Sequence, residues 1–166
     1  MDIVKTAADW TRAEVLSSAF FILFALAFLL SSFGFWQMGR TDMARAYVVP
    51  LLVAGGLLLA LNGGLFVQNQ LKLAGLATVY DASVSGFVTS EIAYAERGLN
   101  NYRIAVFYIF PAIIAACALL VPFLASPVWR ASPITTIAML AIILVIDTNA
   151  NARLEAFREL LAQAAT

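Results

Sequence analysis

Long apolar stretches without a charged side chain dominate the pattern along the chain. Four uncharged runs cover residues 15–39, 46–71, 104–129 and 131–146. A helix of about 20 apolar residues spans the hydrocarbon core of a bilayer. The first three runs reach that length alone, and the fourth reaches it by continuing through Asp147 to about Ala150. The pattern therefore predicts four membrane-spanning helices, at approximately 17–39, 47–70, 104–125 and 132–150.

Apolar side chains at helical spacing also occur outside these spans. Between the second and third spans, steps of three and four residues connect Val84, Phe87, Val88, Ile92, Ala95, Leu99 and Tyr102. This spacing is typical of an amphipathic helix, which we place at approximately 83–102, in the cytoplasm or at the membrane interface. An apolar face also extends the fourth helix through approximately 151–163, by way of Leu154, Phe157, Leu160 and Leu161. We expect this extension to pack against the 83–102 helix.

The N-terminal segment completes the predicted fold. Residues 3–15 are expected to form an amphipathic helix along the interface, with Trp10 in the headgroup layer. The fold class is all-α, and residues 1–166 form a single membrane domain. The predicted architecture is a four-transmembrane helix bundle with a cytoplasmic or interfacial helix between spans two and three. Its fourth helix extends into the cytoplasm.

Small residues recur along one face of the second span. Gly56, Ala60 and Gly64 follow one another at intervals of four residues. Small side chains at that spacing let helix backbones approach closely in lipid. Two interpretations stay open: a specific helix-packing seam, or a span that is merely rich in small residues.

Composition supports a membrane protein and narrows its chemistry. Of the 166 residues 63% are hydrophobic and 12% are charged, whereas soluble domains carry about 25% charged residues. The formal net charge is zero, so nucleic acid is not an expected partner. The sequence has no histidine, and its one cysteine, Cys117, allows neither a disulfide nor a thiolate cluster. We therefore expect no catalytic, metal or cofactor-binding residues and no cofactor.

The distribution of basic residues predicts the orientation. Seven of the ten Lys and Arg residues lie in the N-terminal segment, in the connection between spans two and three and in the C-terminal tail. Short loops on the cytoplasmic side of a membrane carry an excess of Lys and Arg. Together with an even number of spans, this asymmetry predicts that both termini are cytoplasmic. The expected partners are the lipid bilayer and a second copy of the chain or a larger membrane complex.

Asp147 is the charged residue that most invites a functional interpretation. It follows Ser132 by about fifteen residues, which is about 22 Å of helix in a core of roughly 30 Å. We therefore expect it one or two turns from the cytoplasmic boundary, where an aspartate costs less than about 2.5–3.5 kcal/mol. We favour a structural carboxylate, and the alternatives are, first, a proton- or ion-coupling role and, second, catalysis. The candidate partners are Asn151, Arg153, Arg103 and Lys72.

Glu91 and Asn62 complete the candidate polar residues. Glu91 is either a buried partner for a basic residue or the wet edge of the 83–102 helix, and we favour the wet edge. Asn62 lies in the second span, where an interhelical hydrogen bond is the usual role of an amide. The segment DTNAN at 147–151 begins like a calcium loop. Ala152 and Arg158 replace the glycine and glutamate that such a loop needs, which excludes a calcium site.

Two segments resemble known membrane proteins. Glu91, the segment NNYRI and the later series Asp147, Ala150, Arg153 and Phe157 resemble small uncharacterised bacterial four-helix integral membrane proteins, over residues 87–161. Tyr94 and Ala152 depart from that pattern, which has basic residues there. The resemblance implies a bacterial inner-membrane protein and no particular activity. The segment ERGLNNYRIAVFYIFP loosely resembles glutathione-using membrane enzymes, which carry the arginine within a span.

These observations favour a non-enzymatic integral membrane protein, an accessory, assembly or interaction component of the bacterial inner membrane. The alternative is a small proton- or cation-coupled transporter or channel that uses Asp147. A more distant alternative is a small glutathione-type membrane enzyme. A transporter needs a polar pathway that reaches the middle of the membrane, and the candidates for it are Asn62, Ser31 and Ser32.

Overall fold

The computed structural model describes the backbone of residues 3–164 and all their side chains except those of Asp81 and Ala164. Residues 1–2 and 165–166, which the predicted domain includes, lie outside the described residues. Every regular element within 3–164 is helical. Four helical stretches are long and apolar enough to cross a membrane: Ile3–Met38, Asp42–Tyr80, Val84–Phe123 and Pro127–Gln163. At this level, the all-helical fold with four candidate membrane spans is confirmed.

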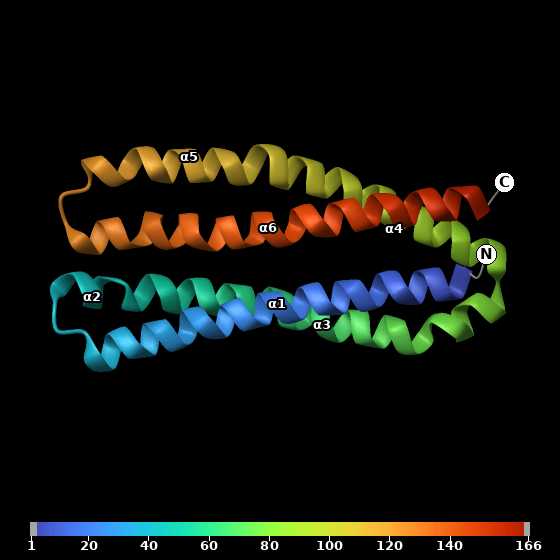
Figure 1. The fold of residues 1–166 in the computed structure, drawn as a ribbon, viewed down its shortest axis with the longest axis horizontal. Helices are drawn as coiled ribbons and strands as arrows, with labels where there is room; N and C mark the ends of the chain where they lie inside the picture. Colours follow the sequence, from blue (N-terminus) through green and yellow to red (C-terminus); the bar gives the residue numbers. More distant parts are fainter. Residues whose placement is uncertain (1–2, 165–166) are drawn as a thin grey trace.

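The helices pair into two antiparallel hairpins (Figure 1). The first hairpin consists of α1 (Ile3–Met38) and α3 (Val48–Ala82), joined by the short helix α2 (Asp42–Ala46). In the second, a nearly continuous rod turns back into α6 (Pro127–Ala164); the rod comprises α4 (Val84–Ile104), η1 (Ala105–Ile109), α5 (Phe110–Leu120) and η2 (Val121–Phe123). The start of α1 and the end of α6 lie at one end of the bundle, which we call the terminal end. The α2 turn and the α5–α6 connection lie at the other, the loop end.

Local chemistry explains where the helices break. The hydroxyl of Ser83 accepts a hydrogen bond from the Gly86 N–H at 3.2 Å, and this N-cap ends α3 and starts α4. Pro111 has no N–H to donate, and its ring would collide with the carbonyl four residues earlier. The π-helical turn η1 ends two residues before Pro111, and its wider winding accommodates this misfit. Pro122 lies in the 3₁₀ turn η2 that ends the rod.

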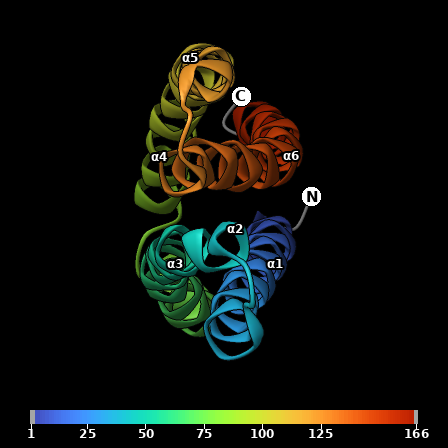
Figure 2. The ribbon, with the colours of Figure 1, turned by 90° about the vertical axis from the view of Figure 1, so that its left-hand side faces the viewer.

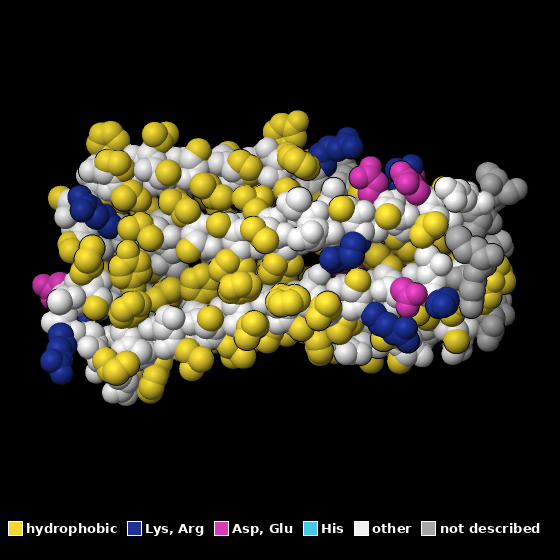
Figure 3. All heavy atoms as spheres, in the orientation of Figure 1, with side chains coloured by type: hydrophobic (Ala, Val, Ile, Leu, Met, Phe, Trp, Pro, Cys, Tyr) yellow, Lys and Arg dark blue, Asp and Glu magenta, His cyan; other side chains and the backbone are white. Residues whose placement is uncertain are grey.

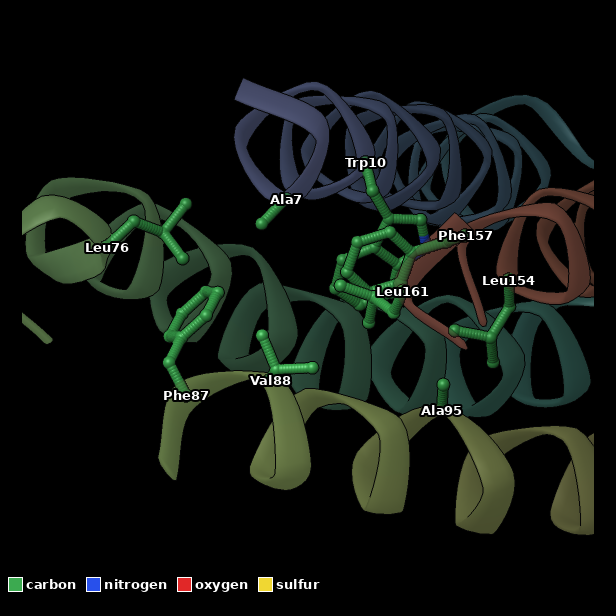
Figure 4. Close-up of a cluster of buried hydrophobic side chains, with 9 residues drawn as sticks. All are labelled: Ala7, Trp10, Leu76, Phe87, Val88, Ala95, Leu154, Phe157 and Leu161. Carbon is green, nitrogen blue, oxygen red and sulfur yellow. The ribbon is translucent and has the colours of Figure 1, made fainter. Parts of the chain in front are cut away.

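An apolar cluster at the terminal end fastens the two hairpins together. This terminal core comprises Ala7, Trp10, Leu76, Phe87, Val88, Ala95, Leu154, Phe157 and Leu161 (Figure 4). The Trp10 and Phe157 rings stack with their centroids 4.8 Å apart. Gly98 of α4 lies so close to α6 that an added Cβ would be 2.7 Å from Leu154 Cδ2. The predicted packing of the fourth helix against α4 is thus confirmed.

The N-terminal segment does not form the separate helix that the sequence predicted, and its place at the membrane interface stays a prediction. Residues 3–15 are the start of one continuous helix, α1, and not a separate helix. Trp10 is 8% exposed and Ala7 is fully buried, because both pack into the terminal core. Trp36 and Trp129 keep most of their surface exposed, as expected for rings near span ends.

Toward the loop end the hairpins are less tightly joined. A second apolar cluster, the mid-bundle cluster, comprises Phe21, Ala25, Phe28, Leu51 and Leu58, with side chains of α6 packed against it. Within residues 3–164, α5 packs on α6 and touches neither α1 nor α3. None of the residues of α5 is buried. Figure 2, an end view, shows α5 on the side of α6 that faces away from α1.

The predicted seam of Gly56, Ala60 and Gly64 makes no close contact within the chain. A Cβ added at Gly56 or Gly64 would meet nothing within 4 Å. The close approach of α1 and α3 occurs instead at Gly55, where an added Cβ would lie 2.9 Å from the Ala25 carbonyl oxygen. Whether the predicted face joins two copies of the chain stays a prediction.

Charged side chains are separated along the length of the bundle. Figure 3 shows Lys, Arg, Asp and Glu at the loop end and toward the terminal end, with apolar side chains covering the surface between them. This division is the one expected when a bilayer surrounds the uncharged part of a helical bundle.

Candidate functional site

A polar cleft lies between the hairpins, on the loop side of the terminal core. Its volume is about 600 Å³, within the range of ligand sites. The polar side chains that line it come from α1, α3, α4 and α6: Glu14, Ser17, Ser18, Asn62, Gln68, Asn69, Tyr94, Tyr102 and Asp147. Polar groups lose hydration inside a membrane bundle, so a cluster of them is a candidate functional site.

The remaining walls of the cleft are apolar. Leu61 and Leu65 of α3 line the cleft and also expose 67% and 49% of their surface, so the cleft opens to the flank of the bundle. Ala60 and Gly64 line it as well. These two members of the predicted packing face therefore line a cleft. Because their side chains are small, they leave space beside α3.

Glu14 is held by an ion pair across the two hairpins. Arg153 Nη2 of α6 lies 3.2 Å from Glu14 Oε1 of α1 and donates a second hydrogen bond to Ser17 Oγ at 2.6 Å. The Glu14 side chain is only 16% exposed. Because burial strengthens the attraction between opposite charges, Arg153 compensates the charge of Glu14. Arg153 itself is not among the residues that line the cleft.

Asp147 lines the same cleft and has no such partner. Within the described part of the chain its carboxylate forms no hydrogen bond or ion pair. The predicted partners are engaged elsewhere or absent: Arg153 binds Glu14, Lys72 binds Glu91, and neither Asn151 nor Arg103 lines the cleft. The expected partner of Asp147 is therefore not found among the described residues, and the choice between a structural and an ion-coupling carboxylate stays a prediction. The charge of Asp147 is left uncompensated and faces open space.

Two nearly buried polar groups face the cleft with unused hydrogen-bonding capacity. Ser18 is 5% exposed, and its hydroxyl has no partner among the described residues. Asn62 is 8% exposed, and its amide nitrogen donates to the Leu58 carbonyl of its own helix at 3.1 Å. That bond leaves the Asn62 carbonyl oxygen as an acceptor for another group. The buried side-chain atoms that lack a partner among the described residues lie elsewhere, on Trp10, Thr135 and Arg153. The oxygens of Ser18 and Asn62 are instead accessible from the cleft and available to a ligand.

Glu91 lies outside the cleft in a separate charged pair. Lys72 Nζ is 2.7 Å from Glu91 Oε2, and the same ammonium group lies 4.9 Å and 4.6 Å from the ring centres of Trp10 and Tyr94. Glu91 is 7% exposed. Its assignment to the wet edge of the helix is therefore wrong, and the alternative of a buried partner is what the structure shows.

The structure brings only some of the candidate residues together. Asp147 and Asn62 share the cleft, and Arg153 reaches it through Glu14. Sequence reasoning missed Glu14, although a signal for it existed. Glu14 precedes the first uncharged run and Asp147 follows the last. Because α1 and α6 run in opposite directions, the two carboxylates come to line the same cleft.

Ser31 and Ser32, two of the candidates for the polar pathway of a transporter, do not line the cleft. Ser32 donates a hydrogen bond to the Val48 carbonyl at 2.7 Å, and Ser31 lines other, shallower pockets toward the loop end. Of the expected set, Asn62 alone lines the polar cleft.

The chemistry of the site is that of binding a charged group. Among the described residues, no group of three or more acidic, cysteine or histidine side chains could hold a metal ion. Glu96 and Arg97, the residues that resemble the glutathione-using enzymes, lie with Asn100 and Asn101 on an exposed face of α4 and do not reach the cleft. Two carboxylates, of which one is uncompensated, favour a cation.

Comparisons with known protein families, with curated proteins and with solved structures found no match. The resemblance to small bacterial four-helix membrane proteins therefore stays a prediction, and the function is argued from the structure.

Proposed function

We propose that this chain is a non-enzymatic integral membrane protein of the bacterial inner membrane, where it acts as an accessory or interaction component. One observation carries the proposal. On the loop-end side of the polar cleft, α1, α3 and α6 all carry apolar side chains. These are the mid-bundle cluster and its α6 neighbours Met139, Ile142 and Ile146. This apolar layer separates the cleft from the loop end, so the bundle resembles a binding scaffold more than a conduit.

Both termini are cytoplasmic in this proposal, and the outer surfaces of the bundle supply the contacts. The orientation is supported by the position of seven of the ten basic residues. The α5 helix has no buried residue, and Gly56 and Gly64 leave open space beside α3. These surfaces suit a second copy of the chain or a larger membrane complex, since helices associate in lipid by close packing.

A second function, a proton- or cation-coupled transporter, is favoured by the uncompensated carboxylate of Asp147 in the cleft. An ionisable group in a span that has no partner commonly marks an ion or proton site. In that case the apolar layer would have to open during transport.

Flux measurements in liposomes distinguish the two functions. We expect the purified parent protein to conduct neither protons nor monovalent cations above the rate of protein-free liposomes. Asp147→Asn and Glu155→Gln, which remove one negative charge from the cleft and from an exposed position of the same helix, should behave like the parent. A parent flux that Asp147→Asn abolishes at unchanged melting temperature, and that Glu155→Gln leaves intact, would establish the transporter instead.

A further inference from the structure

The cleft carries a net negative charge that its own residues do not neutralise. Its lining contains Glu14 and Asp147 and no Lys or Arg side chain. Arg153 compensates Glu14 at 3.2 Å, so one carboxylate remains. In a poorly hydrated place, a lone carboxylate attracts a cation far more strongly than it does in water.

Neutral polar groups of the cleft also suit a cation. The carbonyl oxygen of Asn62 and the hydroxyl oxygen of Ser18 are acceptors that no donor among the described residues occupies. Tyr102 adds an aromatic ring to the lining, and aromatic faces attract cations. The bundle already uses this attraction nearby, where the Lys72 ammonium lies 4.6 Å from the Tyr94 ring centre.

The size and walls of the cleft indicate what kind of cation fits. A volume of about 600 Å³ is that of a site for an organic molecule, and it far exceeds a bare metal ion. Leu61, Leu65 and Phe110 provide apolar surface in the same cleft as Asp147. Because Leu61 and Leu65 are exposed on the flank of the bundle, such a molecule can enter from the apolar layer of the membrane.

We propose that the cleft binds a monovalent organic cation with apolar substituents. Its charged centre lies against Asp147, with Asn62 and Ser18 as neighbours. Its apolar groups lie against Leu61, Leu65 and Phe110. The proposal concerns binding alone and holds whether or not the ligand crosses the membrane, so it is independent of the flux experiment.

Two probes of the same shape and opposite charge test the proposal. Tetraphenylphosphonium and tetraphenylborate are titrated into the full-length protein in detergent by calorimetry. We expect the phosphonium to bind to one site per chain and the borate not to bind. Equal binding of the two ions, or binding of the borate alone, would overturn the proposal, because the sign of the charge would then not determine recognition.

Three variants locate the site. Asp147→Asn should weaken phosphonium binding by about tenfold or more, whereas the matched change Glu155→Gln should leave it unchanged. Ala60→Leu places a larger side chain on an exposed position of α3 that lines the cleft, so it should weaken binding by occlusion. Ala60→Leu keeps Asp147, so its result does not depend on any effect of Asp147 on folding. The melting temperatures of all variants show whether each one is folded. Unchanged binding in both Asp147→Asn and Ala60→Leu would place the cation elsewhere.

A lipid headgroup is the other source of an organic ammonium. Mixed micelles containing phosphatidylethanolamine should displace the phosphonium no better than micelles containing phosphatidylglycerol, because the phosphate of either lipid is repelled by the cleft. Displacement by phosphatidylethanolamine alone would overturn the assignment to a free cation and make the cleft a headgroup site.

Discussion

A lysine ammonium group lies between two aromatic rings and a carboxylate at the terminal end of the bundle. Lys72 and Glu91 retain 26% and 10% of their side-chain exposure, and their atoms are 2.7 Å apart. A buried ion pair adds little to the free energy of unfolding compared with two apolar residues in its place. Removing one partner is costly, however, because the other charge then stays buried without a counter-charge.

This asymmetry gives a prediction for the Lys72–Glu91 pair. Glu91→Gln should lower the free energy of unfolding by about 2–3 kcal/mol, because it leaves the Lys72 ammonium without its counter-charge. The double variant Lys72→Met with Glu91→Gln should cost less than Glu91→Gln alone. Equilibrium unfolding in detergent measures both. Glu96→Gln, an exposed position of the same helix, is the control and should change stability by less than about 0.5 kcal/mol. A double variant that costs as much as Glu91→Gln, or more, would contradict the pairing.

At the scale of elements, α3 presents two neighbouring glycines to different surroundings. A Cβ at Gly55 would lie 2.8 Å from Leu29 Cγ and 2.9 Å from the Ala25 carbonyl oxygen, whereas a Cβ at Gly56 would meet open space. The hairpin of α1 and α3 therefore depends on the absence of a side chain at Gly55.

Alanine at each glycine tests this difference. Gly55→Ala should destabilise the protein by about 1–3 kcal/mol, because the methyl group forces α1 and α3 apart. Gly56→Ala should be neutral or stabilise it by up to about 1 kcal/mol, since alanine favours helix over glycine. Melting curves of the two purified variants provide the comparison. A larger loss for Gly56→Ala would mean that this face is covered, for example by a second copy of the chain.

The sequence predicted the helices themselves better than it predicted which side of each helix is buried. The uncharged runs predicted four spans because a charged side chain is costly on any side of a helix in lipid. The side of α3 that packs against α1 was not predictable, because Gly55 and Gly56 are equally small and the span is apolar on all sides. Likewise Glu91 stands at the margin of an apolar stripe, and its burial depends on Lys72 of another helix. The polar cleft combines side chains from α1, α3, α4 and α6, which no local pattern connects.

At the scale of the whole molecule, the basic residues divide between the two ends of the bundle (Figure 3). Arg40, Arg45 and Arg130 belong to the segments around the loop end, and the other seven belong to the terminal end. Since basic segments are retained in the cytoplasm during insertion, the terminal end is the cytoplasmic end in our proposal.

Reporter fusions test this orientation. Green fluorescent protein fused to either terminus should fluoresce, and alkaline phosphatase fused there should be inactive, because these ends remain in the cytoplasm. The same reporters placed after Asp42 or Ser126 should give the opposite result. Cell fluorescence and phosphatase activity, normalised to the amount of fusion protein, provide the measurement. Active phosphatase at the C-terminus would reverse the orientation.

The terminal core has a consequence for the synthesis of the chain. Trp10 leaves the ribosome long before its stacking partner Phe157, by roughly 10–30 s at usual elongation rates. During that interval the hairpin of α1 and α3 can already close at Gly55, but the face of α1 that carries Ala7 and Trp10 lacks the side chains of α6 that complete its cover. A nascent chain therefore presents an aromatic patch to the insertion machinery until the last helix is made, and a chain truncated before α6 would keep that patch for its lifetime.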